Sequence, residues 1–419
     1  MTTTLATARD RMLLAKDASR SIGLLTDAEK RDALRAIADA VEAATPEIVA
    51  ANAEDLERGR ASGLSDGLQD RLRLDEARVA ALAAAVRDVA LLPDPVGRIL
   101  DERALPSGVR LQKVSVPFGV VGSIYEARPN VTVDIAALAL RSGNAVVLRG
   151  GTAAELTNAA LVDAMRGALS SRGLDPEAIQ TVDSFGREGA RDLMNARGLI
   201  DVLVPRGSAQ LIETVVTESS VPVIETGAGV VHIVLDATAP LEWATDIVVN
   251  AKVQRPSVCN AVETVLVHRD AAERLIPPVV AALQAQGVTV HGDPTVGRLA
   301  DGVVAATEAD WASEYMSLDL AMRVVDDLDD ALDHIRRYST HHTESIVTDD
   351  AANAERFLAE VDSAVVMANA STRFTDGGEF GFGAEVGIST QKLHARGPMG
   401  LAELTSTKWL ARGAGQVRA

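Results

Sequence analysis

The 419-residue sequence contains a single cysteine, Cys259, within the segment QRPSVCNAVETVLVH at residues 254–268. A lone cysteine is often a small buried hydrophobic residue, but a thiolate is also a strong nucleophile that forms thioesters with acyl groups. Arg255 lies four residues earlier, so a helical segment would place its guanidinium one turn away and favour the thiolate, as would a helix amino terminus at the cysteine. The segment therefore has two interpretations, a core residue or a nucleophile.

Three further polar positions lie at the ends of predicted elements, where α/β proteins commonly build their sites. Glu225 follows an apolar run and precedes Thr-Gly-Ala-Gly, in which glycines permit a tight turn or a close backbone approach; a simple cap is the alternative. Asn130 lies just before a predicted helix, a position that equally suits an N-cap. Arg206, Gly207 and Ser208 join a predicted strand to a helix whose amino terminus is suited to an anion, although such termini are common without a ligand.

The sequence lacks the motifs that are typical of several other kinds of chemistry. Neither G-x-G-x-x-G nor G-x-x-x-x-G-K-[ST] occurs, so the usual dinucleotide fingerprint and the phosphate-binding P-loop are not found. There is no H-E-x-x-H, and the seven histidines are scattered, so no metal site is expected. A Ser-His-Asp hydrolase has little support without a G-x-S-x-G elbow.

Composition narrows the class of protein. The length predicts at least two domains. A net charge of -18 and an aromatic content of 3% argue against nucleic acid and against an anionic membrane surface as partners. No run of 18 apolar residues is present, and a single cysteine suits a reducing compartment, so a cytoplasmic protein is expected.

Short β-rich runs alternate with helical stretches over most of the chain, which predicts two doubly wound α/β domains. The predicted strands are residues 120–125, 145–148, 201–204, 221–224, 230–235, 262–267, 322–325 and 345–348. The predicted helices between the first of these are residues 131–141, 153–171, 187–196 and 207–217. Helices are also expected in the first hundred residues, one of them opening with a capping box at Thr26 and Glu29. Residues 97–118 predict a hairpin arm.

The order of these motifs resembles the aldehyde dehydrogenase superfamily. The motifs follow one another as in that superfamily: Pro-x-Gly-Val-Val-Gly, Asn130, Gly-Asn-Ala-Val-Val-Leu-Arg, Gly-Ser, Glu-Thr-Gly and one Cys. The separation of Glu225 and Cys259 also fits the spacing that the superfamily keeps between its acidic residue and its nucleophile. More narrowly, YEARPNVTVD, NAVVLRGG, QRPSVCNAVETVLVH and RFTDGGEFGFGAEVGISTQKLHARGPMGLAELTS resemble a branch that reduces acyl phosphates. The resemblance covers nearly the whole chain. It implies an α/β aldehyde-dehydrogenase-like fold with two doubly wound domains and a β-arm for oligomerisation.

The resemblance implies NADPH-dependent reduction of L-glutamate 5-phosphate to L-glutamate 5-semialdehyde and phosphate, the second step of proline biosynthesis. Cys259 would be the nucleophile that forms a thioester. The side-chain amide of Asn130 and the backbone N–H of Cys259 would form the oxyanion hole. Glu225 matches the residue that activates the deacylating water in aldehyde-oxidising relatives; in a reductase that reaction wastes the thioester, so proton transfer near the cysteine or a cofactor contact is favoured.

The resemblance also suggests binding residues. Arg149 stands where many relatives have a lysine facing the adenosine ribose, and a guanidinium there suits the 2′-phosphate of NADPH. Arg206, Gly207 and Ser208 are expected at the cofactor. An anionic substrate needs local cations in so acidic a protein, and the candidates are Arg128, Arg255, Arg373, Lys392 and Arg396; a surface salt bridge is an equal alternative for each. The glycine-rich segment at residues 375–387 is expected near the substrate or nicotinamide, with a surface turn as the alternative.

The implied organisation has three parts. Residues 1–96 and 119–226 would form an NADP-binding domain, residues 97–118 and 404–419 an oligomerisation arm, and residues 227–403 a catalytic cysteine domain. A homo-oligomer is expected, and an association with glutamate 5-kinase is left open.

Two rival functions remain: a hydrolytic, NAD-dependent aldehyde dehydrogenase with Glu225 as its base, and a non-catalytic protein on the same fold. The joint presence of Cys259, Asn130 and Glu225 counts against the second.

Overall fold

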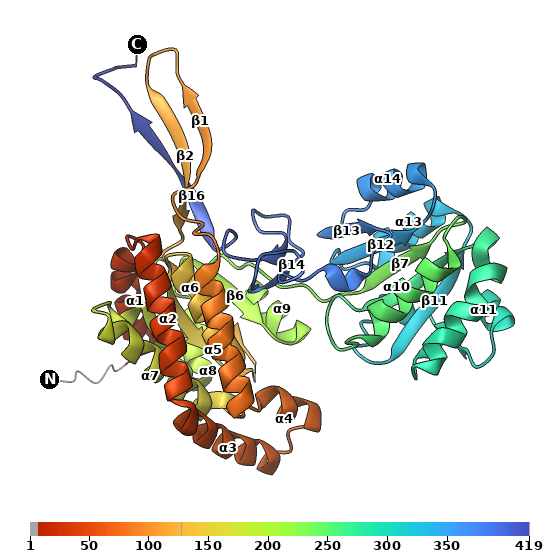
Figure 1. Cartoon of the computed structure of the whole chain (residues 1–419), viewed down its shortest axis with the longest axis horizontal. Coiled ribbons are helices and arrows are strands. Elements are labelled where there is room, and N and C mark those ends of the chain that lie inside the picture. Colours follow the sequence, from red (N-terminus) through yellow and green to blue (C-terminus); the bar gives the residue numbers. More distant parts are fainter. Residues whose placement is uncertain (1–6, 127, 419) are drawn as a thin grey trace. The chain divides into compact units, whose positions relative to one another are not determined.

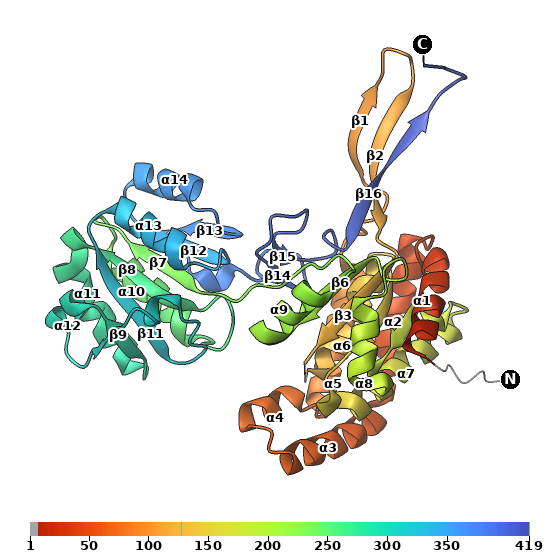
Figure 2. The same cartoon turned by 180° about the vertical axis from the view of Figure 1, so that it is seen from behind.

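The computed structural model describes residues 7–126 and 128–418, which form two compact units. The first unit comprises the chain up to Glu225, together with Gly381–Gly387 and the segment from Met399 onward. The second unit comprises Thr226–Phe380 and Ile388–Pro398. Two short stretches of the predicted cysteine domain, residues 381–387 and 399–403, thus pack with the first unit. Each unit has its own parallel sheet with helices packed against it (Figures 1 and 2).

The first unit begins with five helices. They are α1 (Ala8–Ile22), α2 (Asp27–Ala43), α3 (Thr45–Ala61), α4 (Asp66–Leu72) and α5 (Glu76–Leu91). The capping box expected at Thr26 and Glu29 is present: the backbone N–H of Glu29 donates to the Thr26 hydroxyl at 3.3 Å, and the N–H of Thr26 donates to the Glu29 carboxylate at 2.8 Å. Buried faces rich in alanine, valine and leucine take the place of aromatic packing.

A four-stranded parallel sheet with the order β5-β4-β3-β6 forms the centre of the first unit. Its strands are β3 (Val120–Tyr125), β4 (Ala145–Arg149), β5 (Ile179–Thr181) and β6 (Val202–Arg206), and its helices are α6 (Pro129–Arg141), α7 (Glu155–Ser171), α8 (Gly186–Met194) and α9 (Ala209–Glu218). The strand predicted at residues 221–224 is wrong, because only an isolated bridge joins Val223 to Leu203. Pro222 has no N–H with which to extend the ladder.

An antiparallel three-stranded arm extends from the first unit (Figure 1). The predicted hairpin is present as β1 (Ile99–Ala104) and β2 (Arg110–Pro117), and β16 (Thr405–Arg412) pairs with β2 along its whole length. Ile99, Leu100 and Trp409 are about half exposed on this arm, so its two outer strands carry apolar side chains into solvent.

The second unit contains a seven-stranded parallel sheet with the order β10-β9-β11-β8-β7-β12-β13. Its strands are β7 (Val231–Leu235), β8 (Val262–His268), β9 (Thr289–Gly292), β10 (Val304–Ala305), β11 (Asp319–Val325), β12 (Thr343–Val347) and β13 (Val365–Ala368). Its helices are α10 (Leu241–Val253), α11 (Arg269–Ala285), α12 (Pro294–Leu299), α13 (Leu328–Tyr338) and α14 (Ala351–Glu360). A two-stranded sheet, β14 (Gly387–Ser389) and β15 (Gly397–Met399), completes the described elements.

The predicted doubly wound α/β architecture is therefore confirmed, since parallel strands alternate with helices in both units. Both faces of such a sheet are covered, which explains the continuous apolar runs in strands such as β3, β7 and β8. Among the described residues, no helix has the length and apolar character needed to cross a membrane.

Candidate active site

Cys259 lies in a turn between α10 and β8 and is partly exposed. The expected helical turn between Arg255 and Cys259 is wrong, because α10 ends at Val253, and no helix begins at the cysteine. The physical reason is Pro256, which disfavours helical backbone at the residue before it. Any activation of the thiol must therefore come from nearby charges rather than from a helix.

A buried ion pair joins the elements on either side of this turn. Lys252, in the last turn of α10, places its Nζ 2.6 Å from the Oε2 of Glu263 on β8, and both side chains are fully buried. Burial raises the pKa of Glu263 to about 7, and the neighbouring ammonium of Lys252 opposes that rise. Removing one member of such a pair leaves a buried charge, typically at a cost of about 3–5 kcal/mol, so the pair fixes the two ends of the cysteine turn.

Gly229 brings a second segment against the cysteine. A β-carbon at this position would overlap the carbonyl of Cys259, so the two backbones touch, and only glycine permits that approach. The Gly229 N–H donates to the Glu314 carboxylate at 2.8 Å. Gly229 precedes β7 and Cys259 precedes β8, so the cysteine lies at the amino ends of the strands, opposite to the edge where open α/β sheets usually bind ligands.

Two of the predicted substrate cations lie near Cys259. Arg373 is part of the short 3₁₀ turn Thr372–Phe374, and its charge interacts with both Cys259 and Arg255. Burial is the main reason that the pKa of Arg373 lies below its ordinary value; Arg255 adds to this effect, whereas Asp376 and Cys259 oppose it. A guanidinium stays protonated near neutral pH, so the positive charge of Arg373 favours the thiolate form of Cys259, and Arg255 adds a second positive charge beside Arg373.

Hydrogen bonds fix Arg373 at this place. Its Nε donates to the Oε1 of Gln254 at 2.8 Å, and its Nη1 donates to the side-chain oxygen of Asn260. The Thr372 hydroxyl donates to the backbone oxygen of Asn260 at 2.7 Å, and the Asn260 amide donates to the Thr375 carbonyl at 2.8 Å. The residues on both sides of the cysteine are thus bonded to one turn, which orients the cations.

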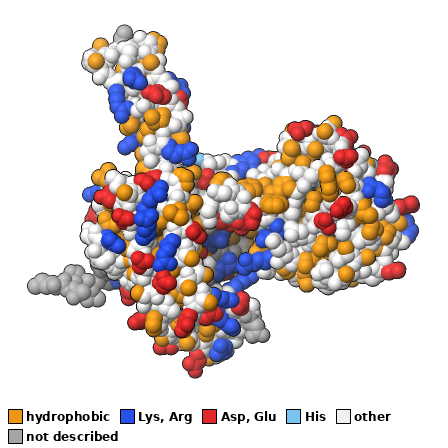
Figure 3. All heavy atoms as spheres, in the orientation of Figure 1, with side chains coloured by type: hydrophobic (Ala, Val, Ile, Leu, Met, Phe, Trp, Pro, Cys, Tyr) orange, Lys and Arg blue, Asp and Glu red, His pale blue; other side chains and the backbone are white. Residues whose placement is uncertain are grey.

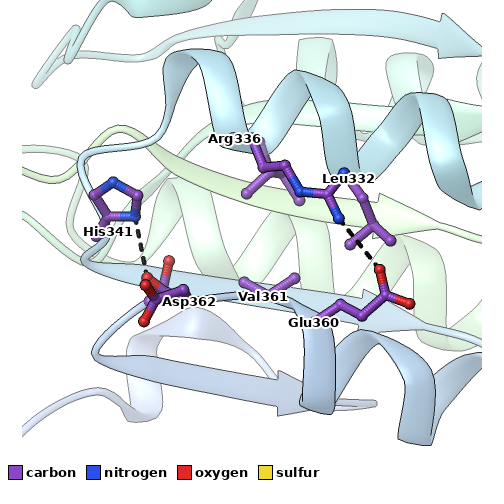
Figure 4. A pocket seen from close by; sticks show the side chains of 8 residues that line it. Leu332, Arg336, His341, Glu360, Val361 and Asp362 are labelled. Atoms are coloured by element: carbon purple, nitrogen blue, oxygen red, sulfur yellow. Dashed lines mark hydrogen bonds and ion pairs between the residues drawn. The ribbon is translucent and has the colours of Figure 1, made fainter.

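Lys392 and Arg396 have a different neighbour, Asp362. The ammonium of Lys392 and the guanidinium of Arg396 both pair with this carboxylate, the latter at 2.9 Å. Asp362 lines a cavity of about 190 Å³ in the second unit, where it accepts a bond from the ring of His341 through its backbone oxygen (Figure 4). The structure therefore places these two cations in a salt-bridge cluster and places Arg255 and Arg373 at the cysteine.

Asn130, Arg128 and Glu225 belong to the first unit. Asn130 is the second residue of α6 and not its N-cap, because that position is held by Arg128. The Nδ2 of Asn130 donates to the Oδ2 of Asp134 at 3.1 Å. Arg128 and Glu225 are both partly exposed. The side chain of Asn130 is thus oriented by a neighbour in its own helix.

Arg149 lies at the carboxyl end of β4, above a hydrogen-bonded chain of buried polar groups. Its Nη1 donates to the Gly150 carbonyl at 2.7 Å, while its buried Nε has no partner among the described residues. The Gly150 N–H donates to Asp183 at 2.7 Å, and Asp183 in turn accepts from Asn158 at 3.1 Å. Burial raises the pKa of Asp183, and its bonds to Asn158 and Gly150 oppose that rise. This network fixes the backbone that follows Arg149.

The amino terminus of α9 already holds an anion in the form of a carboxylate. The Ser208 N–H donates to Glu126 at 3.0 Å, and the Ser208 hydroxyl donates to the other oxygen of the same carboxylate at 2.7 Å. A β-carbon at Gly207 would lie 2.8 Å from the Glu126 carboxyl carbon, so the anion sits close against the backbone. Arg149 and Arg206 flank the end of β3 on the neighbouring strands. The Ser208 donors are thus bonded to Glu126, and the two arginines lie at the carboxyl edge of the sheet, where such folds usually bind ligands.

Sequence reasoning missed Glu126 and Asp134. Each had a signal in the sequence: Glu126 directly follows β3 at the edge of the sheet where such folds usually bind ligands, and Asp134 is an acidic residue within the apolar helix α6. The partner of Glu126, however, depends on a tertiary contact, and the partner of Asp134 depends on the orientation of its side chain. Among the described residues, no group of three or more metal-ligating side chains comes together.

Comparison with known proteins places the chain in a family. The sequence model of the aldehyde dehydrogenase family matches residues 2–302. The γ-glutamyl phosphate reductase of Leifsonia xyli subsp. xyli is 64% identical over 417 residues, covering 100% of this chain and 99% of the relative, and that of Clavibacter michiganensis subsp. michiganensis is 67% identical over 404 residues, covering 96% and 94%. The crystal structure of the Thermotoga maritima γ-glutamyl phosphate reductase has a TM-score of 0.96 at 42% identity, covering 98% of this chain and 100% of that chain.

The chain therefore belongs to the aldehyde dehydrogenase family, whose members are oxidoreductases that use nicotinamide cofactors. Within that family, the relatives reported above are γ-glutamyl phosphate reductases, and they match this chain over nearly its full length. The resemblance predicted from the sequence motifs is confirmed, as is the aldehyde-dehydrogenase-like fold.

Proposed function

We propose that the protein reduces L-glutamate 5-phosphate to L-glutamate 5-semialdehyde with NADPH, releasing phosphate, as the second step of proline biosynthesis. The observation that carries this proposal is the 64% identity to a γ-glutamyl phosphate reductase over the whole chain. The cationic surroundings of Cys259 add chemical support, because an acyl phosphate needs a nucleophile and its leaving phosphate needs positive charge.

The first step forms a thioester. The Cys259 thiolate attacks the acyl carbon, the carbon–oxygen bond to phosphate breaks, and phosphate leaves with the electron pair. Arg255 and Arg373 keep the thiol ionised and neutralise charge on the departing phosphate. Arg128 is a further candidate for the substrate's anionic groups, and Lys392 and Arg396 are weaker ones because Asp362 already pairs with both.

The second step reduces the thioester. The bound nicotinamide supplies a hydride to the acyl carbon. The Asn130 amide and the Cys259 N–H stabilise the oxyanion that develops there, as they do in the first step. The carbon–sulfur bond then breaks, the aldehyde leaves, and Cys259 returns as a thiolate. Glu225 serves proton transfer near the cysteine or contacts the cofactor.

NADPH is bound by Arg149 and by the turn Arg206-Gly207-Ser208. Arg149 pairs with the 2′-phosphate, so its loss affects the cofactor alone. Arg149→Ala is expected to raise the KM for NADPH about 10- to 100-fold, in line with losing a charged hydrogen bond of about 1.5–3 kcal/mol, and to change the KM for the acyl phosphate less than about twofold. Steady-state kinetics with each substrate varied in turn measures both values; equal effects on the two substrates would remove Arg149 from the cofactor site.

The β-arm joins subunits in a homo-oligomer. Exposed apolar side chains on β1 and β16 carry this proposal, and Figure 3 shows hydrophobic side chains at the surface of the arm. Leu100→Glu with Trp409→Glu is expected to reduce the molar mass in solution to that of one chain, as light scattering coupled to gel filtration would show. Leu24→Glu, at an 84% exposed leucine outside the arm, is the matched control. An unchanged mass in the arm variant would contradict the proposal.

A coupled reaction tests the proposed activity. The acyl phosphate is made in place from glutamate and ATP by a glutamate 5-kinase, and NADPH oxidation is followed after the protein is added. Oxidation that requires glutamate, ATP and kinase together is the expected result, and its absence at saturating kinase would contradict the proposal. Whether the kinase must bind the protein stays a prediction, as does a cytoplasmic location, where a reducing environment keeps Cys259 a free thiol.

A further inference from the structure

The carboxylate of Asp134 determines how the amide of Asn130 is presented. Asn130 is the second residue of α6, and Asp134 follows one helical turn later, where its Oδ2 accepts from the Asn130 Nδ2 at 3.1 Å. A carboxamide has two N–H groups and one oxygen. With one N–H bound to Asp134, the second N–H is held in a defined direction, and it has no acceptor among the described residues.

Asp134 is an unusual residue for its surroundings. The α6 residues beside it, Val133 and Ile135, are buried and apolar, and the carboxyl group itself is partly buried. The groups that face the carboxyl are the Asn130 amide on its own helix and the charge of Arg206 at the end of β6. Withdrawing a carboxylate from water into such surroundings is costly unless hydrogen bonds or opposite charges compensate it, and here Asn130 and Arg206 do so.

We infer that Asp134 is a positioning residue for the oxyanion-stabilising amide of Asn130, an inference that rests on the proposed role of Asn130 in catalysis. An ionised carboxylate accepts hydrogen bonds and cannot donate, so it accepts the Nδ2 of Asn130 and rejects the Oδ1. This choice fixes the second N–H for the developing oxyanion before the reaction begins. Donors that are fixed in advance contribute most to the stabilisation of such charge.

Protonation of Asp134 removes this control. A protonated carboxyl group can donate to the Oδ1 of Asn130, so the amide can turn over and withdraw its N–H. Burial raises the pKa of Asp134 to about 6, while the bond from Asn130 and the charge of Arg206 oppose the rise. The carboxylate is required, so the contribution of Asp134 is present above about pH 6 and is lost as the pH falls through that value.

A double-mutant cycle tests whether Asp134 acts through Asn130. Asp134→Ala is expected to lower kcat about tenfold in the wild-type background but less than about twofold in the Asn130→Ala background, with both KM values nearly unchanged. Equal losses in the two backgrounds would overturn the inference, because a structural role would be independent of Asn130. Wild-type kcat in Asn130→Ala would instead overturn the proposed role of Asn130 together with the inference, so the two failures are distinguishable.

A pH profile gives a second readout that does not require an alanine at this position. Asp134→Asn keeps an oxygen that accepts from Asn130 but does not titrate. The ratio of wild-type kcat to that of Asp134→Asn is expected to be constant above about pH 7.5 and to fall about fivefold or more by pH 5, because a group with a pKa of about 6 is then mostly protonated. A flat ratio would overturn the inference. Asp32→Ala, which removes an exposed carboxylate paired with Arg35 on α2, is the matched control and should leave the profile unchanged.

Discussion

Replacing Cys259 by alanine is expected to abolish turnover, with a loss of at least about 10⁴-fold, because the thioester has no other nucleophile on which to form. Stability should change little, since Cys259 is partly exposed in a turn and loses few packed atoms. Reduction of the acyl phosphate measures the first effect, and the thermal midpoint measures the second.

Cys259→Ser is the conservative companion to this variant. A hydroxyl is far less ionised than a thiol beside Arg255 and Arg373, so the serine variant should also lose nearly all turnover. Cofactor binding should survive in both variants, which a fluorescence titration with NADPH would show. Turnover within about tenfold of wild type in the alanine variant would remove Cys259 as the nucleophile.

Asn130→Ala is expected to give the second largest loss, about 10²- to 10³-fold in kcat, because it removes one of two donors to the oxyanion. The KM values should change much less, since the donor acts mainly on charge that develops in the transition state. Folding should persist because Asn130 is the second residue of α6, where a side-chain cap is not needed. A loss confined to KM would assign Asn130 to binding rather than to oxyanion stabilisation.

Much of the fold was predictable because its signal is local. The alternation of apolar runs and amphipathic stretches identified β3, β7 and β8, and the capping box at Thr26 marked the start of α2. The strand at residues 221–224 failed because Pro222 interrupts its donors, a local feature that was outweighed by the apolar composition. The sequence predicted that both β2 and β16 belong to the arm but did not predict that they pair, since the two strands are distant in the sequence.

The site was predictable in its residue types and less so in its geometry. Cys259 and Asn130 were singled out by motif, yet the helical relation between Arg255 and Cys259 was wrong, because Pro256 ends the helix earlier. The carboxylate of Glu126 at the α9 terminus comes from a residue 82 positions before its partner, Ser208. Such a contact follows from strand order in the sheet, and no spacing within the sequence reports it.

The phosphate dependence of the reverse reaction tests the thioester account most directly. Glutamate 5-semialdehyde and NADP are given to the purified protein with and without inorganic phosphate, and the reduced cofactor is followed by its absorbance. The account predicts that NADP reduction requires phosphate, which resolves the thioester on Cys259, and that it vanishes in Cys259→Ala. Equal NADP reduction without phosphate would contradict the account, because water would then resolve the thioester with Glu225 as its base, as in a hydrolytic aldehyde dehydrogenase.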